Sequence, residues 1–347
     1  MKKIVFTGGG TLGHVMPNVF LMQEMKDYEY FYIGGNGIEK SYVKDKVKKY
    51  YQIPTIKLER GKILKNLKIP FVLISAISQA KKALKEIQPD VIFSKGGYVS
   101  LPVCIAAKML KIPIVAHESD SSFGLANKII LKVCNKMCVN FSSLEDADKK
   151  ITYTGPIFSK NFDNKRVETK GLILDTEKPT ILIVGGSLGS VKINQNICAI
   201  LKDLLSQFNI IHITGKGNNK QKSFDNYNSM ESTQDINNLY NIADFVIGRS
   251  GAGVTAECFY KNLPMILIPL ENKSTRGDQV LNAKYYKNKG VAEIIEESAL
   301  TPTLLYSQIC DFAKNIQNYK QAYIKQDKIN GREKVLEIIE KLSRNKT

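Results

Sequence analysis

Short runs of hydrophobic residues alternate with longer amphipathic segments along most of this chain. The runs with the length and composition of buried parallel strands lie at 4–7, 31–35, 91–94, 112–116, 181–184, 210–214, 245–247 and 264–268. Residues 102–110 form an apolar stretch typical of a crossover helix. Strands that alternate with helices indicate right-handed crossovers and a mainly parallel sheet. The pattern therefore predicts an α/β fold.

Two of the predicted strands run into similar glycine-rich segments. The first leads into Gly8-Gly9-Gly10-Thr11-Leu12-Gly13-His14, and the second leads into Gly185-Gly186-Ser187-Leu188-Gly189-Ser190. Glycine lets a ligand approach the backbone closely, and free N–H groups at a helix start attract phosphate. The repeat predicts two doubly wound Rossmann-like domains with an interdomain cleft, and a substrate that carries pyrophosphate. Neither copy is a strict G-x-G-x-x-G, and no P-loop motif is present.

The domain boundary is expected near Gly155-Pro156, which precedes a polar stretch at 159–178. We predict an N-terminal domain at 1–157, a C-terminal domain at 158–320 and a C-terminal helix at 321–347. The tail from about Ser307 is helical in pattern and strongly charged. We expect the final helix to pack back on the N-terminal domain.

Composition narrows the possible functions. The chain has 347 residues, 43% of them hydrophobic, which is enough for two domains with cores of their own. Its six cysteines lie mostly in apolar runs, which favours buried free thiols, and three histidines without an H-x-x-x-H spacing make a zinc site unexpected. No apolar run approaches the ~20 residues that span a bilayer. The net charge of +17 suggests an anionic partner, but no nucleic-acid-binding signature accompanies it.

One basic segment, residues 60–74, has apolar residues at helical spacing with lysines between them: Leu64, Leu67, Phe71 and Ile74 with Lys62, Lys65 and Lys68. Such a stripe suits contact with a membrane interface. An ordinary helix that faces the core, with solvated lysines, explains the same pattern. Pro70 either starts or breaks the helix at this point.

Polar groups follow several predicted strands, where ligands bind in parallel α/β sheets. His14 ends the first glycine segment, and imidazole titrates near neutral pH, so His14 is a candidate general base; a capping role is the alternative. Glu257 lies early in a predicted helix, where a carboxylate can bind a sugar diol. Asp278 and Gln279 lie at another helix start, where Asp278 also suits an N-cap.

These motifs together resemble the MurG family of bacterial transferases. The resemblance covers nearly the whole chain and depends on segments that occur in the family's order: 8–14, Lys95-Gly96-Gly97-Tyr98-Val99-Ser100, His117-Glu118, Gly124-Leu125-Ala126-Asn127, 185–189 and Gly277-Asp278-Gln279. It implies a GT-B fold and an inverting, metal-independent transfer without a cofactor. The implied reaction moves N-acetylglucosamine from UDP-N-acetylglucosamine to the C4 hydroxyl of N-acetylmuramyl-pentapeptide pyrophosphoryl-undecaprenol (lipid I to lipid II) in peptidoglycan synthesis.

The resemblance also implies roles for particular parts of the chain. The N-terminal domain would bind the lipid acceptor and the C-terminal domain the UDP-sugar, with His14 as the leading candidate for the base. Asn127 would reach the transferred sugar, Ser187 the diphosphate, Glu257 the ribose hydroxyls and Gln279 the sugar. The full set of expected substrate-binding residues is Thr11, Leu12, Gly13, Asn127, Ser187, Ala252, Gly253, Val254, Thr255, Ala256, Glu257, Asp278 and Gln279.

Three positions depart from the family's pattern. Many members have glycine where this chain has Leu12, which limits how closely a ligand approaches. Many have an arginine where this chain has Phe158, so that arginine's role is not carried over. The paired glutamines of some members are Asp278-Gln279 here. These departures indicate a subgroup with a slightly different donor site.

An undecaprenyl-linked acceptor implies an enzyme that is peripheral to the cell membrane, on its cytoplasmic side. Anionic lipids of that leaflet, and proteins of cell-wall synthesis, are then expected partners, and nucleic acid is not. The alternatives are another GT-B enzyme, such as a glycolipid glycosyltransferase or UDP-N-acetylglucosamine 2-epimerase, and a non-catalytic binder of nucleotide sugar or nucleic acid.

Overall fold

The computed structural model describes residues 1–58, 66–163, 167–169, 171–186, 189–218, 223–271 and 277–344. The chain divides into two compact units. Unit 1 comprises Met1–Lys160 and Ile329–Thr347, and unit 2 comprises Asn161–Lys328. The chain therefore leaves unit 1 after Lys160 and returns to it at Ile329.

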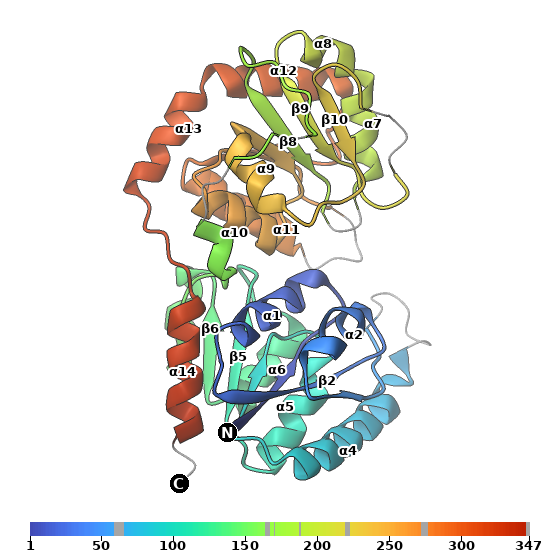
Figure 1. Ribbon diagram of the computed structural model, residues 1–347, viewed down its shortest axis with the longest axis vertical. Coiled ribbons are helices and arrows are strands. Elements are labelled where there is room, and N and C mark those ends of the chain that lie inside the picture. Colours follow the sequence, from blue (N-terminus) through green and yellow to red (C-terminus); the bar gives the residue numbers. More distant parts are fainter. Residues whose placement is uncertain are drawn as a thin grey trace. The chain divides into compact units, whose positions relative to one another are not determined.

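Unit 1 is built on a parallel sheet in the order β3-β2-β1-β4-β5-β6-β7 (Figure 1). The strands are β1 Lys2–Thr7, β2 Tyr28–Gly34, β3 Lys49–Gln52, β4 Val91–Ser94, β5 Ile114–Glu118, β6 Lys136–Val139 and β7 Ile151–Tyr153. The prediction of a strand at 112–116 was displaced by two residues, because Pro113 has no N–H to donate to the ladder. The sheet order places the carboxyl ends of β1, β4 and β5 side by side.

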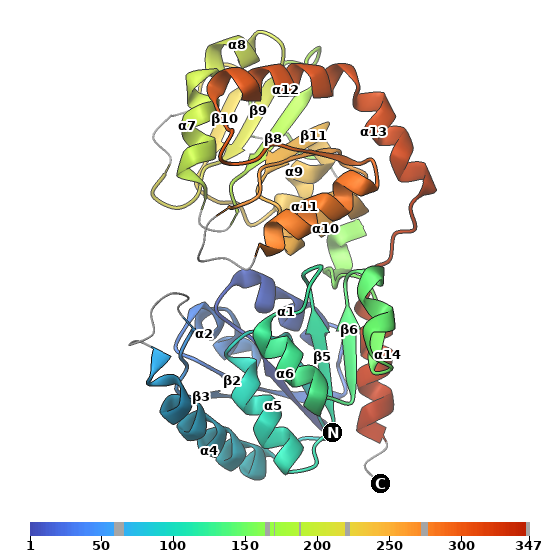
Figure 2. The same cartoon turned by 180° about the vertical axis from the view of Figure 1, so that it is seen from behind.

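Helices cover both faces of this sheet (Figures 1 and 2). They are α1 Met16–Met22, α2 Ile38–Val43, α4 Ile69–Ile87, α5 Ser100–Met109, α6 Leu125–Val133 and α14 Arg332–Arg344, with short 3-10 helices η1 Leu12–His14, η2 Lys44–Lys46 and η3 Ser142–Ala147. A further 3-10 helix, η4 Lys160–Asp163, lies where the chain passes into unit 2. Val5 faces the core that contains α4, α5 and α6, whereas Ile4 and Phe6 face the core that contains α1 and α14. This alternation along β1 is the two-residue period of a strand.

The last helix belongs to the core of unit 1. Val335 and Ile339 of α14 are fully buried in the cluster that contains Ile4 and Phe6. The Ser343 hydroxyl lies 2.7 Å from the Tyr28 hydroxyl and accepts a hydrogen bond from Lys2 Nζ at 3.2 Å. The described ends of the chain therefore lie close together within unit 1.

Unit 2 has a six-stranded parallel sheet in the order β10-β9-β8-β11-β12-β13. Its strands are β8 Thr180–Val184, β9 Asn209–Ile213, β10 Tyr227–Met230, β11 Phe245–Gly248, β12 Met265–Leu267 and β13 Ala292–Ile294. Its helices are α7 Val191–Ala199, α8 Leu201–Leu205, α9 Ile236–Ile242, α10 Ala252–Tyr260, α11 Asp278–Asn288, α12 Pro302–Lys314 and α13 Ile316–Ala322, followed by η5 Tyr323–Lys325. Residues of α7, α8 and α12 form one core with the sheet. The prediction of two Rossmann-like parallel-sheet domains is confirmed.

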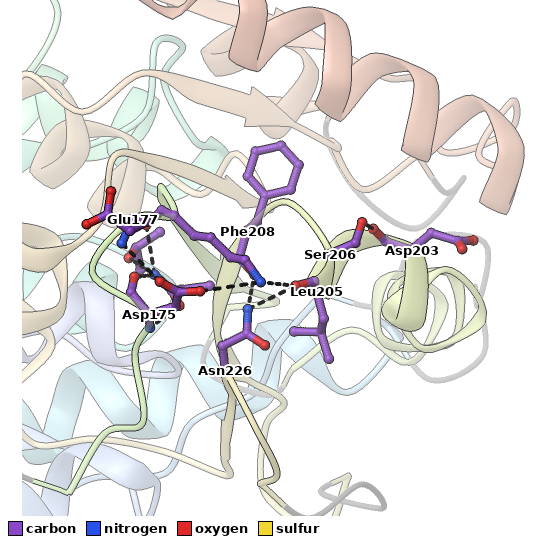
Figure 3. Close-up of polar contacts among 10 residues, drawn as sticks. Asp175, Glu177, Asp203, Leu205, Ser206, Phe208 and Asn226 are labelled. Carbon is purple, nitrogen blue, oxygen red and sulfur yellow. Dashed lines mark hydrogen bonds and ion pairs between the residues drawn. The ribbon is translucent and has the colours of Figure 1, made fainter.

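The amino end of this second sheet is closed by side-chain amides (Figure 3). Asn226 Nδ2 donates to the Leu205 and Phe208 carbonyls at 3.1 and 2.6 Å. Asn209 Nδ2 donates to the Asp175 carbonyl at 2.8 Å, and the Asp175 backbone N–H donates to Asn209 Oδ1, also at 2.8 Å. These bonds satisfy backbone groups that the strands leave unpaired, so the chemistry of this unit is expected at the other end.

Helix α4 presents apolar side chains to solvent. Leu67, just before the helix, is 62% exposed, and Phe71 and Ile74 are 76% and 66% exposed. Pro70 lies in the first turn and starts the helix. The core-facing alternative is therefore wrong for these residues, while Lys62, Leu64 and Lys65 lie outside the described residues.

Three other features bear on the sequence predictions. Four cysteines are buried, but Cys198 is exposed and Cys310 is half-buried, so the prediction of buried thiols was wrong for these two. Among the described residues, no helix combines the length and hydropathy needed to cross a membrane. The same residues contain no group of three or more His, Cys, Asp or Glu side chains that could hold a metal ion.

Candidate functional site

The first glycine segment forms the loop between β1 and η1. Gly10 has a φ of +84°, and a Cβ at this position would lie 3.0 Å from the Tyr98 ring, so glycine is required for both reasons. Thr11 precedes η1, and His14 ends it. The Thr11 hydroxyl lies 2.8 Å from His14 Nδ1. The structure therefore brings together a hydroxyl and an imidazole that sequence reasoning placed on one loop.

The Thr11 contact is compatible with either tautomer of the half-buried His14, because a hydroxyl can both donate and accept. When Nδ1 carries the proton and donates to the Thr11 oxygen, Nε2 has a lone pair that can accept a proton. The opposite tautomer leaves Nε2 protonated and unable to act as a base. Gly97, in the loop after β4, lies beside this ring, because a Cβ there would be 3.9 Å from Nε2. His14 Nε2 thus lies at the carboxyl edge of the sheet.

A buried lysine joins the carboxyl ends of β4 and β5. Lys95 is 1% exposed; its Nζ lies 2.9 Å from His117 Nδ1 and contacts the Ser119 hydroxyl. Burial lowers the pKa of Lys95 to about 8, although the charges of Glu118 and Asp120 oppose that shift. Burial and the nearby Lys95 charge hold the pKa of His117 well below its usual range. His117 is therefore a neutral acceptor for the lysine.

Glu118 organises the loop after β5. Its Oε1 accepts backbone hydrogen bonds from Ser119 and Asp120 at 2.8 and 3.1 Å. Its Oε2 accepts from the Gly124 N–H at 3.1 Å and from Asn127 Nδ2 at 2.9 Å. Asn127 is only 3% exposed, and its Oδ1 has no hydrogen-bond partner among the described residues. The amide nitrogen of this expected sugar contact is thus engaged by a carboxylate.

In unit 2, Glu257 lies on α10 and accepts a hydrogen bond from the buried Tyr240 hydroxyl at 2.8 Å through Oε2. Desolvation raises the pKa of Glu257 to about 7, and the Tyr240 hydrogen bond acts in the opposite direction. A carboxyl with this pKa changes charge within the physiological pH range.

The loop between β11 and α10 is tied to the start of α11. The Ser250 hydroxyl donates to the Gln279 carbonyl at 2.8 Å, and Gln279 Oε1 accepts from the Leu270 N–H at 2.9 Å. Arg249 donates to the Ser190 hydroxyl at 2.9 Å and forms an ion pair with Glu297. These contacts join the loops at the carboxyl edge of unit 2 into a network of hydrogen bonds and an ion pair.

Comparison with known proteins identifies the chain's relatives. Residues 4–139 match the glycosyltransferase family 28 N-terminal domain, and residues 180–342 match the family 28 C-terminal domain. The chain belongs to glycosyltransferase family 28. The first match reaches from β1 to β6 of the unit 1 sheet, and the second contains the whole sheet of unit 2.

Individual members of family 28 are similar over nearly the full length. A Clostridium botulinum protein (strain Alaska E43 / Type E3), named UDP-N-acetylglucosamine--N-acetylmuramyl-(pentapeptide) pyrophosphoryl-undecaprenol N-acetylglucosamine transferase, is 43% identical over 97% of both chains. A protein of the same name from Clostridium novyi (strain NT) is 38% identical over 98% of both. The crystal structure of Acinetobacter baumannii MurG matches 98% of this chain and 100% of its own, with a TM-score of 0.77 and 24% identity. The resemblance to the MurG family is confirmed.

The remaining predicted residues of this family 28 chain differ in accessibility. Thr255 is fully buried, and its hydroxyl donates to the Gly251 carbonyl at 3.0 Å, within its own helix. Ala252 and Ala256 are also buried, whereas Gly253 is exposed and a Cβ there would meet open space. Leu12, Val254 and Asp278 are half-buried, and Gly13 is exposed. Ser187 lies outside the described residues.

Sequence reasoning missed three polar residues that the structure places beside this chemistry: Glu39, Lys95 and Tyr240. Glu39 follows a further glycine-rich turn, Gly34-Gly35-Asn36-Gly37, which was a usable signal. Lys95 lies within a predicted glycine segment, but nothing in the sequence indicates its burial. Tyr240 lies 17 residues before its partner Glu257, on another helix.

Proposed function

We propose that this chain transfers N-acetylglucosamine from UDP-N-acetylglucosamine to the C4 hydroxyl of N-acetylmuramyl-pentapeptide pyrophosphoryl-undecaprenol. The observation that carries this proposal is the 43% identity, over 97% of both chains, to a relative named for that transfer. The two parallel sheets with polar carboxyl edges agree with it. Unit 1 would bind the lipid-linked acceptor, and unit 2 would bind the UDP-sugar.

In the proposed reaction, His14 Nε2 takes the proton of the acceptor C4 hydroxyl. The C4 oxygen then forms a bond to the anomeric carbon of the sugar as the bond to the UDP oxygen breaks, which inverts the configuration. Thr11 supports this role because its oxygen, 2.8 Å from Nδ1, accepts the proton that Nδ1 must carry. UDP leaves with the electron pair of the broken bond.

For the donor, Glu257 would accept hydrogen bonds from the ribose hydroxyls through Oε1 while Tyr240 occupies Oε2. Gln279 would contact the sugar, and its Oε1 already accepts from the Leu270 N–H, so its amide nitrogen is the group that would donate. A charge-assisted hydrogen bond of this kind contributes about 1.5–3 kcal/mol. Glu257 is therefore the residue expected to matter most for nucleotide affinity.

We propose that the enzyme works at the cytoplasmic face of the cell membrane, and that α4 contributes to this contact. Leu67, Phe71 and Ile74 form an exposed apolar stripe, and the exposed Lys68 lies within it. An apolar face with adjacent lysines binds an anionic interface by burial and by charge. The net charge of +17 acts in the same direction. Proteins of cell-wall synthesis remain expected partners, without a specific surface assigned.

The decisive assay supplies radiolabelled UDP-N-acetylglucosamine and lipid I in detergent micelles. Label that enters the butanol phase only when lipid I is present supports the proposal. Label that appears on a diacylglycerol acceptor but not on lipid I would identify a glycolipid glycosyltransferase instead. Conversion of the nucleotide sugar to its 2-epimer without any acceptor would identify the epimerase. Binding of the nucleotide sugar with no turnover would indicate a non-catalytic protein.

A further inference from the structure

A buried carboxylate connects the glycine-rich turns that follow β1 and β2. Glu39 lies in the first turn of α2 and is 1% exposed. Its Oε1 accepts a hydrogen bond from the Gly35 N–H at 3.0 Å, and its Oε2 accepts one from the Gly10 N–H at 3.2 Å. One side chain therefore bridges two loops that are separated by 25 residues in sequence.

The glycines around Glu39 leave space for this group and for nothing larger. A Cβ on Gly9 would lie 2.5 Å from the Glu39 carboxyl carbon, and a Cβ on Gly37 would lie 2.6 Å from Oε2. A Cβ on Gly35 would lie 2.8 Å from the Thr55 hydroxyl and 3.0 Å from Oε1. Real side chains do not approach that closely, so several glycines of the two turns are explained by the carboxylate that they surround.

Two tyrosine hydroxyls form hydrogen bonds with the backbone of the same two turns. Tyr32 donates to the Gly8 carbonyl at 2.7 Å, and Tyr50 donates to the Gly35 carbonyl at 2.6 Å. Burial is the main cause that raises the pKa of both tyrosines, and the negative charge of Glu39 adds to it. Both hydroxyls therefore remain donors at any physiological pH. Among the described residues, Glu39 has no ion-pair partner within 4.0 Å, so the backbone N–H groups compensate its charge.

This arrangement changes the role of the first glycine loop. The Gly10 N–H, which sequence reasoning offered to a phosphate, already donates to an anion that belongs to the protein. The loop continues directly from Gly10 into Thr11 and then His14, whose side chains meet at 2.8 Å. The orientation of the Thr11 and His14 side chains therefore depends on the position of the Gly10 backbone, which the hydrogen bond to Glu39 fixes.

We propose that Glu39 is a positioning residue for the transfer. Its carboxylate holds the β1–η1 loop so that the Thr11 hydroxyl faces His14 Nδ1 and directs the basic nitrogen, Nε2, to the carboxyl edge of the sheet. This inference rests on the proposed function, in which His14 is the base. Glu39 itself does not touch either substrate.

Glu39→Gln tests the proposal, because it keeps the size of the side chain but offers an NH2 group to one of the two N–H donors. We expect kcat to fall on the order of tenfold to a hundredfold, as for a displaced catalytic group, while calorimetric affinity for UDP-N-acetylglucosamine stays unchanged. Glu29→Gln, which removes a half-buried carboxylate on β2 that pairs with Lys48, is the matched control and is expected to leave kcat unchanged.

A second readout does not depend on activity. The chain has three histidines, so ¹⁵N-detected histidine spectra are simple, and a His14→Gln sample assigns the His14 signals. In Glu39→Gln, the two ring nitrogens of His14 are expected to shift toward a mixture of tautomers. His212 in unit 2 is held through both nitrogens, at 3.0 Å each, and serves as the internal reference.

The outcomes separate the two proposals. Unchanged His14 signals in Glu39→Gln overturn the positioning role, whatever happens to kcat. If the His14 signals shift in Glu39→Gln but the wild-type protein shows no transfer activity, the positioning of His14 by Glu39 is kept and the proposed function is rejected. If Glu39→Gln does not fold, Glu39→Asp, which retains the charge but is one methylene shorter, is measured in the same way. If neither variant folds, Glu39 serves the fold alone and the positioning role is overturned.

Discussion

The charge state of Glu257 should make donor binding depend on pH. Its pKa of about 7 arises from desolvation, against which the Tyr240 hydrogen bond at 2.8 Å acts. With this pKa, about 90% of the free protein carries the protonated carboxyl at pH 6 and about 10% at pH 8. If the ribose hydroxyls bind the carboxylate form, the apparent Kd for the donor should be about tenfold weaker at pH 6 than at pH 8.

Two variants determine whether Glu257 is the group responsible. Glu257→Gln cannot ionise, so its affinity should be lower at pH 8 and flat between pH 6 and pH 8. Tyr240→Phe removes the hydrogen bond that lowers the pKa, so the transition should move to higher pH. The control is a second tyrosine–carboxylate pair in unit 2, in which Tyr319 donates to Glu293 at 3.1 Å; Glu293→Gln should follow the wild-type curve.

Isothermal titration calorimetry with UDP-N-acetylglucosamine is the suitable assay, because its diphosphate diester does not titrate between pH 6 and pH 8. A wild-type affinity that is independent of pH, or a Glu257→Gln variant that keeps the wild-type dependence, would refute the reasoning. The same pKa shift has a consequence for stability. Because the folded state holds this proton more tightly than the unfolded state, the free energy of unfolding should decrease as pH rises from 4.5 to about 7.

Three further outcomes concern unit 1. His14→Gln should lower kcat by about 10²–10⁴-fold, and Thr11→Val by less, with donor affinity intact; a His14→Gln variant with wild-type kcat would exclude His14 as the base. The pKa of Lys95 is lowered from 10.5 to about 8, so the folded state binds fewer protons than the unfolded state between pH 8 and pH 10.5. Over this range the free energy of unfolding of the wild type should rise by up to about 3 kcal/mol relative to that of Lys95→Met. If the free energy of unfolding, measured with urea, changes with pH equally in both proteins, this expectation is wrong. The double variant Phe71→Ser, Ile74→Ser should cosediment less with anionic vesicles at unchanged melting temperature, and undiminished binding would place the membrane contact elsewhere.

The central strands could be predicted from the sequence because they are short and apolar, and because glycine follows several of them, such as β1, β4 and β8. The edge strand β3, with the sequence Lys49-Tyr50-Tyr51-Gln52, could not, because its side chains are polar or half-buried and carry no continuous hydrophobic signal. The strand β13, Ala292–Ile294, is too short to stand out. The parallel character of both sheets, by contrast, follows from alternating strands and helices, whereas the strand order within each sheet was not predicted.

The chemistry at the site was predictable only where it is local in sequence. Thr11 and His14 are three residues apart, so their contact follows from one helical turn. Glu39 and Lys95 could not be assigned in this way, since the groups that satisfy them come from other loops: Gly10 for the carboxylate and His117 for the ammonium. A charged residue in a sequence is expected at the surface unless its partners are known.

The return of the chain to unit 1 sets an order of events during protein synthesis. Unit 2 is one continuous segment, whereas unit 1 needs α14, which is translated last. At about 5–20 residues per second, the ribosome needs on the order of 10 to 40 s to travel from Lys160 to that helix. During this interval Ile4 and Phe6 lack the cover that Val335 and Ile339 later provide. The nascent chain therefore finishes unit 2 while an apolar strip of unit 1 is still accessible to chaperones.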